Sequence, residues 1–168
     1  PVSIAIAGTH GKTSTCSMLG EILTAAELYP TMVIGGIVNK FQSNTISGSG
    51  NIIVVEADEF GRSFLTLQPT MGLVTNLDLE HLDCYENLED LQTAFTQFAN
   101  SVPFYGRIGI CIDNINAASI IPNIKRPVIT FGIQKDAEIR ASCLHFKDNH
   151  SRFELSIHGK TQGELTVH

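Results

Sequence analysis

The residues of this 168-residue chain best suited to chemistry form the segment Gly8-Thr9-His10-Gly11-Lys12-Thr13. The segment follows a short apolar run and precedes a helical pattern. In that setting glycines let backbone N–H groups turn toward phosphate oxygens, and the positive end of the helix favours an anion. Lys12 is expected to reach the β- and γ-phosphates of a nucleotide, and the Thr13 hydroxyl to bind Mg²⁺. The predicted nucleotide-binding residues of this loop are Gly8, Thr9, His10, Gly11, Lys12, Thr13 and Ser14.

The loop departs from the general phosphate-loop pattern at one position. That pattern has a glycine five residues before Gly11, where this chain has Ile6. The alternative interpretation is a glycine-rich turn with a solvated lysine, and His10 fits a spacer as well as a residue that approaches substrate. The order of strand, loop and helix favours the nucleotide site.

A second group of polar residues follows a buried strand, in Val54-Val55-Glu56-Ala57-Asp58-Glu59. Ligands of open α/β sheets gather outside the carboxyl ends of the strands. A carboxylate there can hold Mg²⁺ against a bound triphosphate. Glu56 is nearest the strand end and is the predicted metal ligand, whereas Asp58 and Glu59 fit an acidic helix N-terminus.

A third group, Thr75 to Asp83, follows another strand-like run. It contains Asn76, and it places His81 among acidic residues. Taken from the residues alone, His81 is either a metal ligand or an ordinary loop residue, and both interpretations remain open.

The positions of apolar residues predict the elements that carry these groups. Short apolar runs indicate strands at residues 2–7, 32–34, 52–55, 71–75, 108–112 and 128–131. A helix is predicted from Thr13, and another from Leu88 with Asn87 as its N-cap. A further helix can occupy residues 114–121. The first helix is expected to bury one face, formed by Met18, Leu19, Ile22, Leu23 and Ala26.

Strands that alternate with helices predict an α/β fold containing a phosphate loop, with a mostly parallel, doubly wound sheet flanked by helices. After about Gly132 the period changes, because Phe153, Leu155 and Ile157 alternate with polar residues. Turns are expected at residues 148–149 and 159–160. We therefore predict one domain, with a core at residues 1–133 and a small C-terminal antiparallel β meander at 134–168.

Composition excludes several classes of function. The formal charge of −6 and the lack of a basic stripe argue against a nucleic-acid partner. No apolar run approaches the roughly 20 residues of a membrane span. The four cysteines form no CxxC pair, which argues against zinc and disulfides and indicates a cytoplasmic protein.

Together the segments GTHGKT, VEADE and TNxxxxHxD resemble the Mur ligase family in order and spacing. Further stretches resemble it too, among them Arg62 to Leu65 and Pro103 to Gly106. The resemblance covers nearly the whole chain and implies the central ATP-binding domain of a three-domain enzyme. It implies N- and C-terminal domains that this chain lacks, so the chain alone is expected to be inactive.

The resemblance implies an ATP- and Mg²⁺-dependent ligase of peptidoglycan synthesis that forms an acyl phosphate on UDP-N-acetylmuramate. GTHGKT together with VEADE is similar to the branch that adds L-alanine. By the same resemblance Lys12 stabilises the transferred phosphoryl group, and Thr13 and Glu56 hold Mg²⁺. His81 is implied to help bind a second metal, and Asn76 to contact substrate or phosphate.

Two departures from the family qualify this picture. Glu80 stands where the family commonly has aspartate, and no lysine lies between His81 and Lys125 to supply the carbamylated lysine of several relatives. One alternative is the branch that recycles an intact wall tripeptide, since it shares the GTHGKT and EADE segments. The other is a non-catalytic nucleotide-binding regulatory module.

Overall fold

The computed structural model describes residues 1–38, 43–79 and 84–167, except for the side chains of 36–38 and 43–44. The described elements, in chain order, are β1 (Val2–Ala7), α1 (Lys12–Ala25), β2 (Thr31–Val38), β3 (Ser43–Ile46), β4 (Ile52–Glu56), η1 (Phe60–Thr66), β5 (Met71–Val74), α2 (Leu88–Ser101), β6 (Arg107–Cys111), α3 (Ile115–Ser119), η2 (Ile121–Asn123), β7 (Val128–Gly132), β8 (Ile139–Lys147), β9 (His150–Ile157) and β10 (Lys160–Val167).

All the described strands form one sheet, in the order β10-β9-β8-β7-β6-β5-β1-β4-β2-β3. The strands from β2 through β4, β1, β5 and β6 to β7 pair in parallel, as the alternating pattern predicted. Within the sheet, β4 and β2 lie on one flank of β1, and β5 lies on its other flank. The carboxyl end of β1 therefore lies at a topological switch point, where ligands of such sheets bind.

The C-terminal strands β8, β9 and β10 are antiparallel to one another, as predicted. They are not a separate piece appended to the core, because β8 pairs in parallel with β7 and continues the same sheet. The turn between β8 and β9 falls at residues 148–149 as expected, but the next turn is His158-Gly159, one residue earlier than predicted. Both of its residues have positive φ, 48° and 74°, as in a type I′ hairpin turn.

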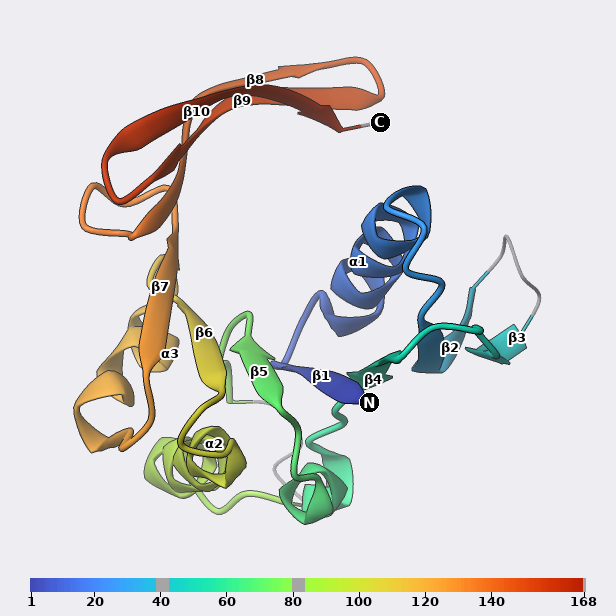
Figure 1. The fold of residues 1–168 in the computed structure, drawn as a ribbon. Coiled ribbons are helices and arrows are strands. Elements are labelled where there is room, and N and C mark those ends of the chain that lie inside the picture. The colour runs from blue at the N-terminus through green and yellow to red at the C-terminus, as the bar shows by residue number, and fades with distance from the viewer. Residues whose placement is uncertain (39–42, 80–83, 168) are drawn as a thin grey trace.

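Helices cover both faces of the sheet, with α1 on one face and α2 with η1 on the other (Figure 1). The predicted face of α2 is confirmed, since Leu91, Phe95 and Phe98 are buried. Phe64 of η1 packs against Phe95 and Phe98, with ring centroids 5.0 and 5.4 Å apart. Asn87 caps α2 by accepting a hydrogen bond from the backbone N–H of Asp90.

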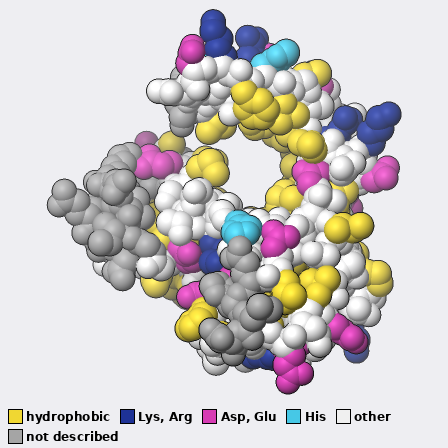
Figure 2. Space-filling view, turned by 180° about the vertical axis from the view of Figure 1, so that it is seen from behind, with side chains coloured by type: hydrophobic (Ala, Val, Ile, Leu, Met, Phe, Trp, Pro, Cys, Tyr) yellow, Lys and Arg dark blue, Asp and Glu magenta, His cyan; other side chains and the backbone are white. Residues whose placement is uncertain are grey.

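The predicted buried face of α1 is confirmed only for Leu19 and Leu23, which are half-buried and pack against the core. Met18 and Ile22 are 48% and 65% exposed, and the buried residues of the helix are Cys16 and Gly20. A Cβ on Gly20 would lie 2.3 Å from the sulfur of Met32 in β2. The helix therefore approaches β2 most closely at Gly20, while Met18 and Ile22 are left exposed. From behind, Figure 2 shows apolar side chains bordering an opening between the β8–β10 part and the rest of the molecule.

Candidate active site

The predicted phosphate loop connects β1 to α1 at the switch point of the sheet. Gly8 has a φ of 142°, and a Cβ at this position would lie 2.0 Å from Oγ1 of Thr75. Gly11 has a φ of 79° and precedes the first turn of α1. Both positions require glycine, because a side chain would strain the backbone or collide with the neighbouring loop. The backbone of the loop therefore turns directly in front of the N-terminal end of α1, which is the arrangement that a phosphate site requires.

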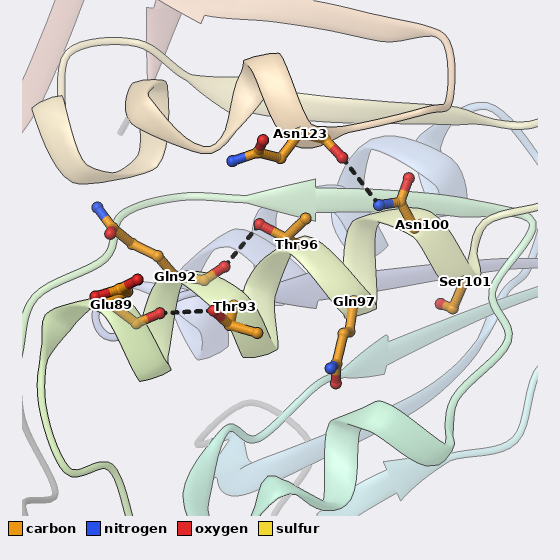
Figure 3. A pocket seen from close by; sticks show the side chains of 8 residues that line it. All are labelled: Glu89, Gln92, Thr93, Thr96, Gln97, Asn100, Ser101 and Asn123. Atoms are coloured by element: carbon orange, nitrogen blue, oxygen red, sulfur yellow. Dashed lines mark hydrogen bonds between the residues drawn. The ribbon is translucent and has the colours of Figure 1, made fainter.

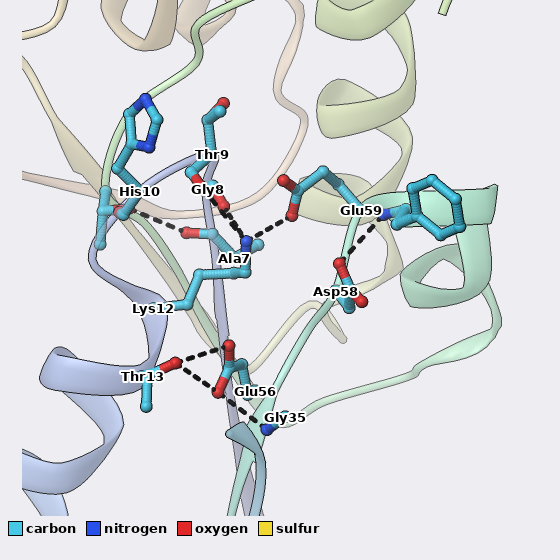
Figure 4. A network of polar contacts seen from close by, with 12 residues as sticks. Ala7, Gly8, Thr9, His10, Lys12, Thr13, Gly35, Glu56, Asp58 and Glu59 are labelled. Atoms are coloured by element: carbon cyan, nitrogen blue, oxygen red, sulfur yellow. Dashed lines mark hydrogen bonds and ion pairs between the residues drawn. The ribbon is translucent and has the colours of Figure 1, made fainter. Parts of the chain in front are cut away.

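Lys12 points back into this loop (Figure 4). Its ammonium group donates hydrogen bonds to the backbone carbonyl oxygens of Gly8, at 2.8 Å, and Thr9, at 3.4 Å. It also forms an ion pair with Oε2 of Glu59 at 2.7 Å. The charge of Lys12 therefore lies at the base of the loop.

Thr13 and Glu56 meet, although they lie 43 residues apart in the chain. The Thr13 hydroxyl lies 3.0 Å from each carboxylate oxygen of Glu56. The backbone N–H of Gly35 in β2 donates to Oε2 of the same carboxylate at 2.9 Å, as Figure 4 shows. A hydroxyl and a carboxylate are the hard oxygen donors that suit Mg²⁺, so this pair fits the predicted metal site.

A hollow of about 310 Å³ opens in front of these groups. It is lined by Thr9, His10, Gly11, Lys12, Thr13, Ser14 and Glu56. The fold thus gathers residues of the loop and of the end of β4 around one space.

A larger hollow, of about 790 Å³, lies along the outer face of α2 (Figure 3). Its threonine hydroxyls donate to carbonyl groups of their own helix, and it lies away from the loop.

Asn76 braces the loop from the end of β5. Its side-chain oxygen accepts from the backbone N–H of His10 at 2.7 Å, and its amide nitrogen donates to the His10 carbonyl at 2.9 Å. Its own carbonyl accepts from the N–H of Thr9 at 3.2 Å, and the Thr75 hydroxyl also donates to the His10 carbonyl. Asn76 therefore lies beside the loop as predicted, with its side-chain amide bound to loop backbone.

Asp78 is a site residue that sequence reasoning missed. Its backbone exchanges hydrogen bonds with the Thr9 hydroxyl, at 2.9 and 3.1 Å, and its carboxylate lies 3.7 Å from Nε2 of His10. Asn114, the N-cap of α3, donates to the Asp78 carboxylate at 3.2 Å. The usable signal was the position of Asp78, four residues beyond the end of β5 on the same edge of the sheet.

Glu59 lies at a helix N-terminus, as predicted, but it also makes a buried contact that the sequence did not indicate. It precedes η1, but it is only 1% exposed and is paired with Lys12. The Tyr85 hydroxyl donates to the Glu59 backbone carbonyl at 2.7 Å. Burial, and then the Glu59 charge, raise the pKa of Tyr85 to about 12, so this hydroxyl stays a donor.

Arg62 forms an ion pair with Asp90 at the start of α2. The guanidinium also donates to the Cys84 carbonyl at 3.1 and 3.3 Å. Through its hydrogen bond, Arg62 holds the pKa of the Asp90 carboxyl below its usual value, and Asp90 raises the pKa of Arg62.

In α1, burial and then the charge of Glu56 raise the pKa of the Cys16 thiol to about 12.

His81 and Glu80 lie outside the described residues. Among the residues that the structure does describe, no group of three or more His, Cys, Asp or Glu side chains could hold a metal. A cation at Thr13 and Glu56 would complete its shell with phosphate oxygens and water, as Mg²⁺ commonly does.

In the same described part of the chain, no helix has both the length and the apolar character to span a membrane.

A glycine-rich loop between a parallel strand and a helix, with a lysine, a threonine and an acid from the next strand end, defines a nucleotide-binding α/β domain. Comparison with known proteins gives the family: the Mur ligase middle domain matches residues 6–168. The chain belongs to the Mur ligase family.

Two curated relatives and one solved structure show how far the similarity extends. The chain is 48% identical over 157 residues to UDP-N-acetylmuramate–L-alanine ligase of Persephonella marina, covering 94% of this chain and 34% of that protein. It is 45% identical over 166 residues to the enzyme of the same name from Syntrophus aciditrophicus, covering 99% and 35%. The solved structure is the UDP-N-acetylmuramate:L-alanyl-γ-D-glutamyl-meso-diaminopimelate ligase from Neisseria meningitides. It has a TM-score of 0.82 and 27% identity, over 97% of this chain and 54% of that one. The chain thus spans about a third of the length of the curated relatives it matches.

Proposed function

We propose that this chain supplies the ATP and Mg²⁺ site of a ligase that joins L-alanine to UDP-N-acetylmuramate in peptidoglycan synthesis. The contact between Thr13 and Glu56, with Lys12 beside it, is the observation that carries the proposal. The names of the curated relatives, at 45% and 48% identity, support the choice of substrates.

In the proposed reaction the carboxylate of the sugar nucleotide takes the γ-phosphoryl group of ATP, and the amine of L-alanine then displaces phosphate. The loop from Gly8 to Ser14 would bind the phosphates through backbone N–H groups, and Lys12 would neutralise charge on the transferred group. Thr13 and Glu56 would hold Mg²⁺, whose chemical contribution is to neutralise the β- and γ-phosphate oxygens. His81 is proposed as a ligand of a second metal.

Asn76 is proposed to act on the nucleotide through the loop that it braces, since its side-chain amide is bound to the His10 backbone. Residues 1–168 are proposed to form the central domain, with the core at 1–133 and the antiparallel part at 134–168. The substrates would then be held together with N- and C-terminal domains of the same protein. A cytoplasmic location is also proposed, and the four free cysteines support it.

A specific observation favours a second candidate within the family. The Neisseria structure is named for a tripeptide substrate, and it superposes on nearly the whole chain. The two candidates share the nucleotide chemistry and differ in the amine. The residues described above contact the phosphate loop, so they do not discriminate between the two amines.

The test is phosphate release by the full-length protein with ATP, Mg²⁺ and UDP-N-acetylmuramate, supplied with L-alanine or with the wall tripeptide. Release that depends on L-alanine is the expected result. Release that depends only on tripeptide would assign the recycling reaction. A folded protein that binds ATP and releases no phosphate with either amine would refute the ligase and favour a regulatory module.

Variants connect the assay to the site. Lys12→Ala should abolish turnover, whereas Lys125→Ala, the same change at an exposed lysine, should leave it unchanged. Because Lys12→Ala leaves the buried Glu59 without its lysine, Glu56→Gln provides a second variant. Glu56→Gln should raise the Mg²⁺ concentration needed for half-maximal turnover. An unchanged Mg²⁺ requirement would contradict the metal role of Glu56.

A further inference from the structure

Glu59 is a buried carboxylate that the reaction proposed above does not use. Its side chain is 2% exposed, and its ion-pair partner Lys12 is 12% exposed. The two residues come from different strand-end loops, 47 positions apart in the chain. Removing two opposite charges from water is unfavourable unless each has a close partner, so this contact determines where the ammonium group rests.

We propose that Glu59 is a positioning residue, the resting counter-ion of Lys12, and that nucleotide phosphates compete with it for the ammonium group. The inference rests on the proposed role of Lys12 in binding phosphate. An ammonium group has three protons to donate. In this structure they are directed at Glu59 and at the carbonyl oxygens of Gly8 and Thr9. To bind a phosphate in the hollow in front of the loop, Lys12 must give up or lengthen at least one of these contacts.

The backbone of Glu59 is anchored, which limits how far its side chain can follow Lys12 toward the phosphates. Its backbone carbonyl accepts hydrogen bonds from the Tyr85 hydroxyl, at 2.7 Å, and from the backbone N–H of Arg62, at 3.0 Å. Tyr85 is 1% exposed, and the Arg62 guanidinium lies 4.9 Å from the centroid of its ring. The competition is therefore between a buried carboxylate on an anchored backbone and an incoming anion.

The sign of the effect follows from comparing the two states of the loop. Without nucleotide, the Glu59 carboxylate stabilises the loop by compensating the buried charge of Lys12. With nucleotide, the phosphates supply that compensation, and the carboxylate then repels them. Both contributions disfavour the bound state, so Glu59 lowers the affinity for nucleotide and assists the release of ADP. A neutral side chain of the same shape should bind nucleotide more tightly.

The experiment is a calorimetric titration of the full-length protein with ADP and Mg²⁺, in the absence of the other substrates. Glu59→Gln should lower the Kd for ADP about 3- to 10-fold, because the neutral side chain neither holds Lys12 by charge nor repels the phosphates. Glu59→Asp keeps the charge but moves it one methylene away from Lys12, and should lower the Kd by about 2-fold. Asp58→Asn is the matched control, because Asp58 is the exposed neighbouring carboxylate and bonds to the N–H of Phe60. Its Kd should equal that of the wild type.

The outcomes separate this inference from the proposed function. If the wild type binds ADP and folded Glu59→Gln binds it equally or more weakly, Glu59 is only structural and the inference is overturned. A lower melting temperature without tighter binding has the same meaning. Equal tightening in Asp58→Asn would indicate a general charge effect and would also overturn it. If Glu59→Gln does not fold, Glu59→Asp decides by the same comparison. A folded wild type that does not bind ADP would refute the nucleotide site itself.

Discussion

Replacing Asn76 with alanine should weaken the phosphate loop before any nucleotide binds. The substitution removes the hydrogen bonds that the Asn76 side chain makes to the backbone N–H and carbonyl of His10, at 2.7 and 2.9 Å. The His10 carbonyl keeps the Thr75 hydroxyl as a donor at 2.8 Å, so it is not left without a partner. The loss is therefore that of ordinary hydrogen bonds at a solvent-accessible position.

The magnitude follows from those contacts. A hydrogen bond contributes about 0.5–1.5 kcal/mol net, and exposed ones fall in the lower half of that range, so the pair is worth about 1–2 kcal/mol. A change of 1 kcal/mol lowers the melting temperature of a domain of this size by about 2–4 °C. The expected decrease is therefore about 2–8 °C. A less ordered loop also binds phosphate less well, so the Kd for ADP should rise about 3- to 10-fold.

Asn100 offers a matched control for this measurement. Its side chain also bridges backbone groups, accepting from the N–H of Lys125 at 2.7 Å and donating to the Asn123 carbonyl at 3.2 Å. It lies at the end of α2, away from the phosphate loop. Asn100→Ala should lower the melting temperature of the nucleotide-free protein by a similar amount and leave the Kd for ADP unchanged.

The result that refutes this reasoning is specific. If Asn76 contacts the nucleotide directly and does not brace the loop, Asn76→Ala will weaken ADP binding while the nucleotide-free protein melts at the wild-type temperature. Differential scanning fluorimetry without nucleotide, followed by calorimetry with ADP, distinguishes the two cases on the same samples.

Three further predictions follow from the structure. Gly8→Ala should prevent nucleotide binding and lower the melting temperature, because φ is 142° and a Cβ would lie 2.0 Å from Oγ1 of Thr75; wild-type values by fluorimetry and calorimetry would contradict this. Asp90, whose pKa is lowered in the folded state, should stabilise the wild type over Asp90→Asn at neutral pH, and this advantage should vanish as pH falls through that lowered pKa. A pH series of melting temperatures with a constant difference would argue otherwise. In the native protein, the exposed Cys143 should react with a thiol reagent at pH 8, while Cys16, buried and with a pKa of about 12, should react only after unfolding.

Local sequence was sufficient to predict much of the fold and the centre of the site. A glycine-rich loop between a strand and a helix can be recognised within a few residues, and Lys12 and Thr13 have fixed places in it. Glu56 could be predicted because the end of a buried strand is itself a local feature, and parallel strands place their ends on one edge of the sheet. The hydrophobic period identified α2 and its buried face for the same reason.

Features that depend on contacts between distant segments were not predictable in this way. The acidic residues at 58 and 59 look alike in sequence, yet only Glu59 turns inward to Lys12, 47 residues away. The predicted buried face of α1 was wrong at Met18 and Ile22, because hydrophobicity favoured them, whereas the close approach to β2 admits only a small residue at Gly20. Likewise, the alternating pattern of β9 identifies a strand but not that β8 joins the parallel sheet at β7.

The missing glycine of the phosphate-loop pattern has a structural explanation in those distant contacts. Ile6, which occupies that position, lies inside β1, where it is 1% exposed and pairs with Glu56 on one side and Leu73 on the other. The turn therefore begins at Gly8, and the loop has fewer residues of its own with which to fix its shape.

The ends of neighbouring strands supply the remaining contacts. Thr75 and Asn76 bind the backbone of His10, and Asp78 binds the Thr9 hydroxyl. Glu59 binds the Lys12 ammonium group. A loop shaped by its neighbours in this way couples nucleotide binding to the positions of β4 and β5. It follows that changes in those strand ends, which need not touch the nucleotide, can alter its affinity.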